Sequence, residues 1–138
     1  MEPNIRAFKN ELRNYNYYLS RLTTLTESIE FFYYQLGGVK GKDPTKERTH
    51  VPPNKEYEWR LREQITILEQ ERDRVAKNID YIQSILAQIK KPLRTAVFEV
   101  YCEGKTIHSV SLKMNLSSSG LDAQITKALR RVLHEEIA

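Results

Sequence analysis

A repeat of large apolar residues every seven positions, over residues 5–36, constrains the fold more than any other feature of the sequence. Its two rows are Ile5, Leu12, Leu19, Thr26 and Tyr33, and Phe8, Tyr15, Leu22, Ile29 and Leu36. A seam of this kind is typical of a long helix that packs along another helix. A third row, of Tyr18, Leu25 and Phe32, widens the stripe and indicates more than one neighbour. We therefore expect a helix over about residues 4–36.

A second long helix is expected over about residues 56–91. Its apolar rows are Leu61, Leu68, Val75, Ile82 and Ile89, and Ile65, Arg72, Ile79 and Leu86. At 1.5 Å rise per residue each helix would be roughly 45 to 55 Å long, and an antiparallel hairpin is the economical arrangement. Arg72 interrupts an apolar row, where a polar group often fixes register or oligomer state. The rows leave open whether the partner is the chain's own first helix, a second copy, or both.

The segment between these helices, residues 37–55, is basic and has almost nothing apolar to bury. It begins at Gly37 and Gly38, which are expected to end the first helix, and it is expected to be a mobile linker. A basic arm on DNA phosphate is the alternative to a solvated linker. Aromatic residues flank the segment: Phe31, Phe32, Tyr33, Tyr34, Tyr57 and Trp59. They predict a packed cluster where the helix ends meet, and a protein-docking patch is the alternative.

Residues 92–138 have the periodicity of three short helices with two sharp corners. Pro92 disfavours helix at Lys91 and so marks the boundary of this part. Gly104 is expected to end the first short helix in the left-handed conformation, and Thr106 to cap the second. Asn115 tolerates the left-handed conformation at the next corner, and the serines that follow can cap the third helix. This is the pattern of a helix-turn-helix.

The fold class that follows is all-α, with two domains. Residues 1–91 are expected to form a long helical hairpin or coiled coil that oligomerises, and residues 92–138 a helix-turn-helix head. The net charge of +4 is compatible with a polyanionic partner. Residues 92–138 contain six Lys and Arg against five Asp and Glu, so this head carries only +1 and the remaining +3 lies in residues 1–91.

Several classes of protein are not expected. The single cysteine, Cys102, excludes an internal disulfide and fits a reducing cytoplasm. No segment approaches the roughly 18 to 20 apolar residues that a membrane span needs. The three histidines, His50, His108 and His134, have no ligand spacing, and Cys102 with His108 supplies only two zinc ligands. Without a phosphate loop or a nucleophile motif, we expect no metal, no cofactor and no enzymatic activity.

A more specific pattern runs without a gap from Leu93 to Leu133. Its residues are Glu103-Gly104 after Tyr101, then Thr106, Val110, Asn115, Ser117, Leu121 and Ala128-Leu129-Arg130. This part resembles the region-four domain of bacterial sigma factors. Two positions depart from that pattern. Asn115 stands where glycine is usual, and the apolar residue expected just before it is displaced, since Leu112 and Met114 flank Lys113. With the helical part ahead of it, the whole chain resembles the sigma-like late-gene regulators of Gram-positive phages, the RinA and ArpU type, in which tryptophan often stands at the position of Ile107.

The resemblance implies a sequence-specific transcriptional regulator, an activator of phage late genes in the cytoplasm of a bacterial host. Its partners would be double-stranded DNA, bacterial RNA polymerase and a second copy of the chain. By carry-over, the base-facing residues are Ser118, Ser119, Asp122 and Ala123. The phosphate candidates are Ser117, Lys113, Lys127, Arg130 and Arg131, of which the four basic side chains are equally readable as solvated surface charges.

The short base-facing side chains predict weak direct readout, about 1 kcal/mol per contact. Dimerisation through the coil, or tethering to RNA polymerase, would therefore have to add affinity. A small terminase-like packaging subunit with a ring-forming coil is the alternative function. Domain order speaks against it, because such proteins usually carry the DNA-binding head first. A protein-interaction adaptor that binds polymerase through the head is a third possibility.

Overall fold

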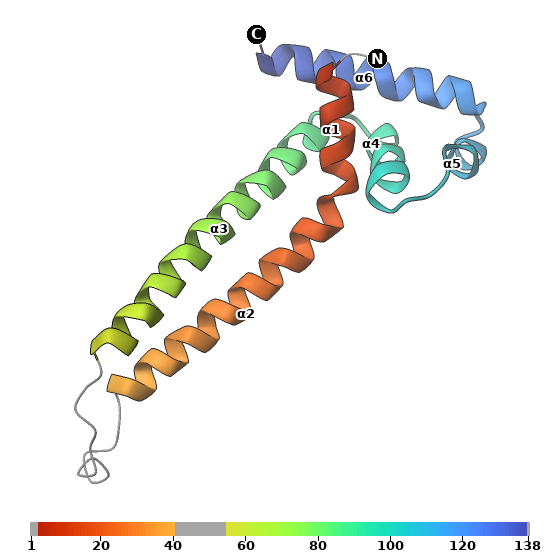
Figure 1. Cartoon of the computed structure of the whole chain (residues 1–138). Coiled ribbons are helices and arrows are strands. Elements are labelled where there is room, and N and C mark those ends of the chain that lie inside the picture. Colours follow the sequence, from red (N-terminus) through yellow and green to blue (C-terminus); the bar gives the residue numbers. More distant parts are fainter. Residues whose placement is uncertain (1–2, 41–54, 138) are drawn as a thin grey trace. The chain divides into compact units, whose positions relative to one another are not determined.

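The computed structural model describes residues 3–40 and 55–137 (Figure 1). Its helices are α1 (Pro3–Arg13), α2 (Tyr15–Lys40), α3 (Lys55–Ala87), α4 (Leu93–Val97), η2 (Phe98–Cys102), α5 (Ile107–Lys113) and α6 (Ser118–Ile137). These residues include no strand, so the predicted all-α class is confirmed for the part of the chain described. None of the helices in these two ranges combines the length and the apolar character that crossing a membrane requires.

The chain divides into two compact units by its internal contacts. Unit 1 consists of Met1–Leu19 and Asn78–Ala138, and unit 2 of Ser20–Lys77. This division differs from the one placed at residues 91 and 92 from the sequence. The difference arises because α1 packs against η2 and α6, so the beginning of the chain belongs with its C-terminal helices.

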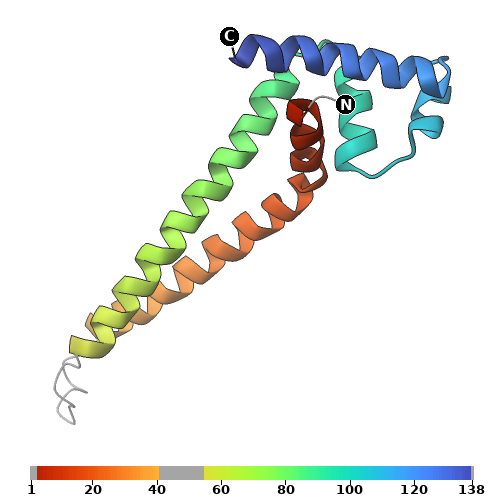
Figure 2. The ribbon, with the colours of Figure 1, turned by 45° about the horizontal axis from the view of Figure 1, so that its top comes forward.

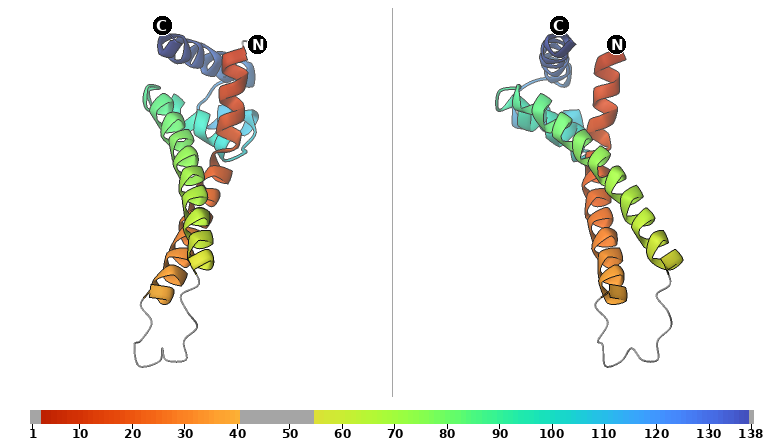
Figure 3. Two further views of the ribbon diagram at one scale, coloured as in Figure 1. Left: turned by 60° about the vertical axis from the view of Figure 1, so that its left-hand side comes forward. Right: turned by 90° about the vertical axis from the view of Figure 1, so that its left-hand side faces the viewer.

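In unit 2, the segments of α2 and α3 run side by side in opposite directions (Figure 3). Arg21, near the start of this part of α2, forms an ion pair of 2.7 Å with Glu71 of α3. Near the other end, the Tyr57 hydroxyl donates to Gln35 Oε1 at 3.3 Å. The apolar residues buried in this unit are Leu25, Ile29, Leu36, Leu61, Ile65 and Val75. In this unit Leu61, Ile65 and Val75 of the rows predicted for the second long helix are buried, whereas Leu68 and Arg72 are half-buried.

The first long helix differs from its prediction, because it is broken at Asn14 into α1 and α2. Up to the first residue of α2 the buried residues follow the predicted rows, through Ile5, Phe8, Leu12 and Tyr15. Beyond it Leu25 is buried, whereas Leu19 and Tyr33 are 38% and 49% exposed. The buried residues here are spaced by three positions twice in succession, from Leu12 to Tyr15 and from Tyr15 to the half-buried Tyr18. A heptad alternates three and four, so this stammer rotates the buried face about the helix axis. Beyond Asn14 the first predicted row leaves the seam, whereas the second predicted row remains buried at Ile29 and Leu36.

The ends of the long helices also differ from their predicted positions. Helix α2 continues past Gly37 to Lys40, since a glycine in right-handed conformation weakens a helix without ending it. Helix α3 ends at Ala87 instead of residue 91. Arg94 satisfies the carbonyls left at this end, because its guanidinium donates to Ile89 O at 2.9 Å and to Ala87 O at 3.3 Å. Most of the predicted linker, residues 41–54, lies outside the described residues.

The aromatic residues beside the predicted linker do not form the expected packed cluster. Phe32 packs on the buried group of Leu36, Leu61 and Ile65. Phe31, Tyr34 and Trp59, by contrast, are 56%, 78% and 62% exposed. Each of these three lies two positions from a buried residue, which places it about 200° round the helix from the buried face. Unit 2 therefore presents large aromatic side chains on its surface.

In unit 1, α1 lies against η2 and α6 (Figure 2). Its buried face consists of Ile5, Phe8, Lys9 and Leu12. The Lys9 ammonium and the Arg13 guanidinium lie 5.2 and 5.5 Å from the centre of the Tyr101 ring, where cations are attracted to the ring face. Helix α1 thus contributes both apolar packing and cation–π contacts to the unit that contains the C-terminal helices.

The first turn of α2 also belongs to unit 1 and is tied to both of its neighbours. Asn16 Nδ2 donates to the carbonyl of Cys102 at 2.9 Å. The Tyr18 hydroxyl donates to Glu11 of α1 at 2.6 Å, and this bond, together with partial burial, raises the pKa of Tyr18 to about 12. These bonds fix the backbone on both sides of Asn14, which makes the break a defined bend.

Candidate nucleic-acid interface

The candidate site begins where the chain leaves η2. The hydrogen bond from Glu103 N to Phe98 O, 3.0 Å long, spans five residues, as in a π-helical turn. Gly104 follows with φ of 76°, a left-handed conformation, and Lys105 N then donates to Glu99 O at 3.0 Å. The predicted left-handed stop at Gly104 is confirmed. It turns the chain sharply towards α5.

Helix α5 starts at the cap predicted from the sequence. Thr106 has an extended backbone, and its hydroxyl accepts a hydrogen bond from Ser109 N at 3.1 Å. Val110 and Ser111 are buried on the inner side of the helix. The buried Ser111 hydroxyl donates to His108 O at 2.7 Å, so this polar group is satisfied within the helix.

The corner between α5 and α6 is formed by Met114, Asn115, Leu116 and Ser117. Asn115 has φ of 58°, which confirms the predicted left-handed position. Leu116 N donates to Ser111 O at 2.9 Å, and this bond closes the end of α5. Ser117 accepts from Gly120 N at 2.9 Å and so caps α6, as predicted. We call this arrangement the α5–α6 corner.

Helix α6 has one buried and one exposed side. The predicted inner row of Leu121, Ile125, Ala128, Leu129 and Val132 is buried throughout. Of the predicted base-facing residues, Ser119, Asp122 and Ala123 are exposed and Ser118 is half-buried. These four lie within an arc of about 140° on the first two turns. The structure therefore brings them together on one side of the helix start.

The four basic side chains among the predicted phosphate contacts fall into two places, and Ser117 is the cap of α6. Lys127, Arg130 and Arg131 are exposed from the middle of α6 onwards, about 15 to 21 Å along the axis from Ser117. Lys113 is separate from them. It is the last residue of α5, and its ammonium lies 2.6 Å from Glu99 Oε2 of η2.

His108 lies beside the start of α6, although the sequence suggested no role for it beyond an incomplete metal site. Its Nδ1 lies 3.4 Å from Ser118 Oγ, so the starts of α5 and α6 are neighbours. The side chain is exposed. The available signal was its place just after the Thr106 cap, because the first residues of both helices meet at such a corner.

The sequence also gave no indication of Glu99, whose carboxylate pairs with two lysines at the ends of α5. Its Oε2 accepts from Lys113 at 2.6 Å and from Lys105 at 2.9 Å. The hydrogen bond from Lys113, and then that from Lys105, lowers the pKa of the Glu99 carboxyl. The same carboxylate, followed by Glu103 at 3.3 Å, raises the pKa of Lys105. No sequence signal indicates this group, because it joins three residues that are six and fourteen positions apart.

Two features of the described side chains bear on nucleophilic and metal chemistry. Cys102 is buried, and this burial raises the pKa of its thiol to about 11, so the nucleophilic thiolate is scarce at neutral pH. Within residues 3–40 and 55–137, no three His, Cys, Asp or Glu side chains are grouped as a metal ion would need.

Comparison of the chain with models of protein families, with curated proteins and with solved structures finds no match.

Proposed function

We propose that this chain is a sequence-specific DNA-binding transcriptional regulator of the sigma region-four-like phage type, without enzymatic activity, and that α5 and α6 act as its helix-turn-helix. The observation that carries the proposal is the α5–α6 corner. It is fixed by the left-handed Asn115 and by the Ser117 cap, and it leaves one side of the first two turns of α6 exposed. An exposed helix start after a tight corner is what enters the DNA major groove in this class of protein.

In this arrangement Ser118, Ser119, Asp122 and Ala123 face base edges. A serine can donate to or accept from several bases, and Asp122 can accept from the cytosine amino group. His108 and Ser117, beside them, are placed to donate to phosphate. Lys127, Arg130 and Arg131 contact phosphates further along α6. The readout side chains are short, so phosphate contacts supply most of the affinity.

The proposal includes a second copy of the chain and, as a further partner, bacterial RNA polymerase. Short reading side chains make a single head weak, and two linked heads bind a double site far more tightly. The exposed aromatic residues Phe31, Tyr34 and Trp59 of unit 2 support association. A symmetric dimer is the favoured form, and activation of late genes the favoured outcome.

The DNA-binding proposal is tested by footprinting and fluorescence anisotropy on DNA that flanks the chain's own gene. Arg130→Glu combined with Arg131→Glu should abolish DNA binding while the far-ultraviolet circular dichroism stays unchanged. The control is Arg74→Glu with Lys77→Glu, which makes the same charge change on exposed positions of α3. If both double variants bind like the parent chain, this face of α6 does not contact DNA.

The association proposal is tested by measuring mass in solution. Tyr34→Ala with Trp59→Ala should shift a dimer towards monomer, because it removes two large exposed rings. Ile67→Ala is the control, since Ile67 is also exposed, at 47%, but on a single aliphatic side chain. A ring of many copies in the parent protein would favour the packaging-subunit alternative over the regulator.

A further inference from the structure

One carboxylate near the α5–α6 corner binds two lysines that are placed at opposite ends of α5. Lys105 precedes the Thr106 cap by one residue, and Lys113 is the last residue of the helix. Both ammonium groups donate to the same oxygen of Glu99, at 2.9 and 2.6 Å. With Glu103 bound to Lys105, two acids and two lysines form a group of net charge zero. Lysines that could attract phosphate are thus neutralised within the protein.

The carboxylate is the fixed member of this group, and the lysines are the movable ones. The Glu99 side chain is only 13% exposed, whereas those of Lys105 and Lys113 are 44% and 57% exposed. Lysine has a long flexible stem, so each ammonium can exchange one oxyanion for another by rotating. Ion pairs at the surface hold such side chains weakly. A phosphate that approaches this surface therefore meets two lysines whose ion pairs with Glu99 it can displace.

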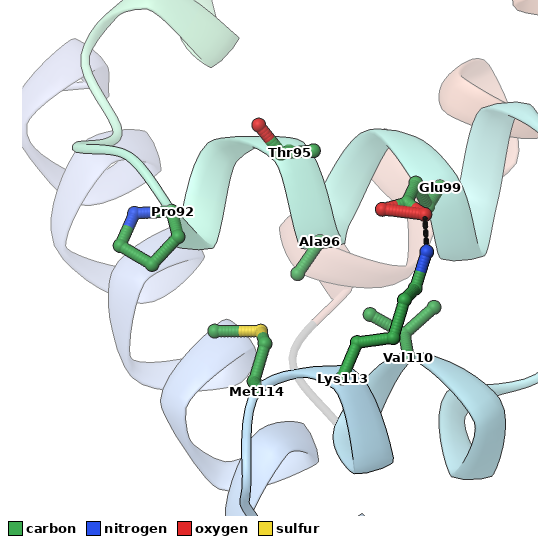
Figure 4. Close-up of a pocket in the computed structure, with 7 residues that line it drawn as sticks. All are labelled: Pro92, Thr95, Ala96, Glu99, Val110, Lys113 and Met114. Carbon is green, nitrogen blue, oxygen red and sulfur yellow. Dashed lines mark hydrogen bonds and ion pairs between the residues drawn. The ribbon is translucent and has the colours of Figure 1, made fainter.

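The surroundings of Lys113 leave room for this exchange. Figure 4 shows its side chain crossing from α5 to Glu99 beside a cavity of about 220 Å³. The cavity is lined by Pro92, Thr95, Ala96, Glu99, Val110, Lys113 and Met114. Because open space already lies beside the stem, the lysine can swing away without leaving a new void in the core.

We propose that Glu99 is an internal competitor for nucleic-acid phosphate, which holds Lys105 and Lys113 and limits both the affinity of the chain for DNA and the salt dependence of that affinity. The inference rests on the proposed DNA binding. The carboxylate stays ionised at neutral pH, because the two lysines lower its pKa. The competition is therefore present at all physiological pH values.

The test is Glu99→Gln in the full chain, which removes the charge and keeps the size of the side chain. For each additional phosphate that a released lysine binds, DNA affinity should rise roughly fivefold at about 0.15 M salt, and the slope of log affinity against log salt should steepen by about one. Glu103→Gln is the matched control. It makes the same charge change but leaves Lys113 on Glu99, so its effect on affinity should be clearly smaller.

Retention on heparin provides a second readout with a polyanion that is not DNA. Glu99→Gln should elute at higher salt than Glu103→Gln, and adding Lys113→Gln should cancel the difference. Equal elution of the two single variants would overturn the competitor role. So would weaker DNA binding by Glu99→Gln together with a lower melting temperature, which would mean that Glu99 positions α5.

The two assays also separate the inference from the function on which it rests. Later elution of Glu99→Gln from heparin, with no binding of parent or variant to the flanking duplex DNA, supports competition by Glu99 for polyanions in general and overturns DNA as the polyanion bound. Binding of DNA by the parent chain, with affinity and salt slope unchanged in Glu99→Gln, supports the function and overturns the competitor.

Discussion

Individual residues set the geometry of the α5–α6 corner and of the start of α5, through one left-handed residue and two capping hydroxyls. Asn115 has φ of 58°, where a side chain with a branched Cβ is strongly disfavoured. Thr106 and Ser117 each bind one amide that would otherwise lack a partner in the helix. These are also the positions that the sequence predicted best, since the preferences of asparagine, serine and threonine at helix ends are local.

Asn115→Val should destabilise the chain by about 1 to 3 kcal/mol, because valine is strained in the left-handed region. Asn115→Gly is the matched variant and should be neutral or slightly stabilising. Urea unfolding followed by circular dichroism measures both. Equal unfolding midpoints for the two variants would contradict the left-handed conformation at the corner.

The thiol of Cys102 produces a pH dependence whose direction follows from its burial. Its pKa rises from 9.0 to about 11 on folding, so between these values the unfolded chain has lost a proton that the native chain retains. The contribution of this thiol to the free energy of unfolding is therefore constant below pH 9. It falls as the pH rises above 9, by on the order of 1 kcal/mol at pH 10.

Cys102→Ala should flatten this part of the curve between pH 8 and 10. The contribution of Tyr18, whose pKa is also raised, is present in both proteins and cancels in the comparison. Urea midpoints measured at several pH values define the two curves. Parallel curves would show that the thiol ionises alike in the native and the unfolded chain.

At the scale of helices, periodicity predicted which residues are buried better than where each helix ends. The inner row of α6 is buried as expected, and so are most residues of the α3 rows, although Ile85 is buried outside them. The break at Asn14 was not predicted, because both the first and the third apolar rows fit a seam and only tertiary packing selects between them. The end of α3 depends likewise on Arg94, whose bonds to Ala87 and Ile89 have no sequence signature.

The burial pattern of α3 predicts a strong contrast between two aliphatic residues. Leu61→Ala should cost about 2 to 5 kcal/mol, since Leu61 is 5% exposed and packs with Leu36 and Ile65. Ile67→Ala should cost less than about 1 kcal/mol, because Ile67 is 47% exposed. Thermal unfolding of both variants measures the difference. Similar melting temperatures would mean that another copy of the chain covers Ile67.

For the molecule as a whole, the start of the chain belongs to the unit that contains the proposed DNA-binding helices. The heptad pattern indicated that residues 5–12 pack on a helix, but a pattern of this kind does not name the partner. Here the partners are η2 and α6, more than 80 positions away. The charges of the site, held by Glu99, are a second consequence of tertiary structure that sequence patterns do not contain.

Ile5→Ala should therefore loosen the C-terminal helices. Ile5 is fully buried in α1, and its truncation should speed hydrogen exchange in α6 and η2 while leaving residues 20–77 unchanged. DNA binding should weaken in parallel. Faster exchange confined to residues 3–13 would contradict the packing of α1 on α6 and η2.

The packing of α1 on α6 also bears on how the protein is synthesised. Helix α1 leaves the ribosome more than 100 residues before α6, with its apolar face ready but its last partner still unmade. Before η2 and α6 are made, only the end of α3, through contacts such as Phe8 with Tyr81, is available to cover it. A chain that stops short of α6 thus leaves part of the apolar face of α1 uncovered, where proteases and chaperones can recognise it. Incomplete copies are thereby marked for removal.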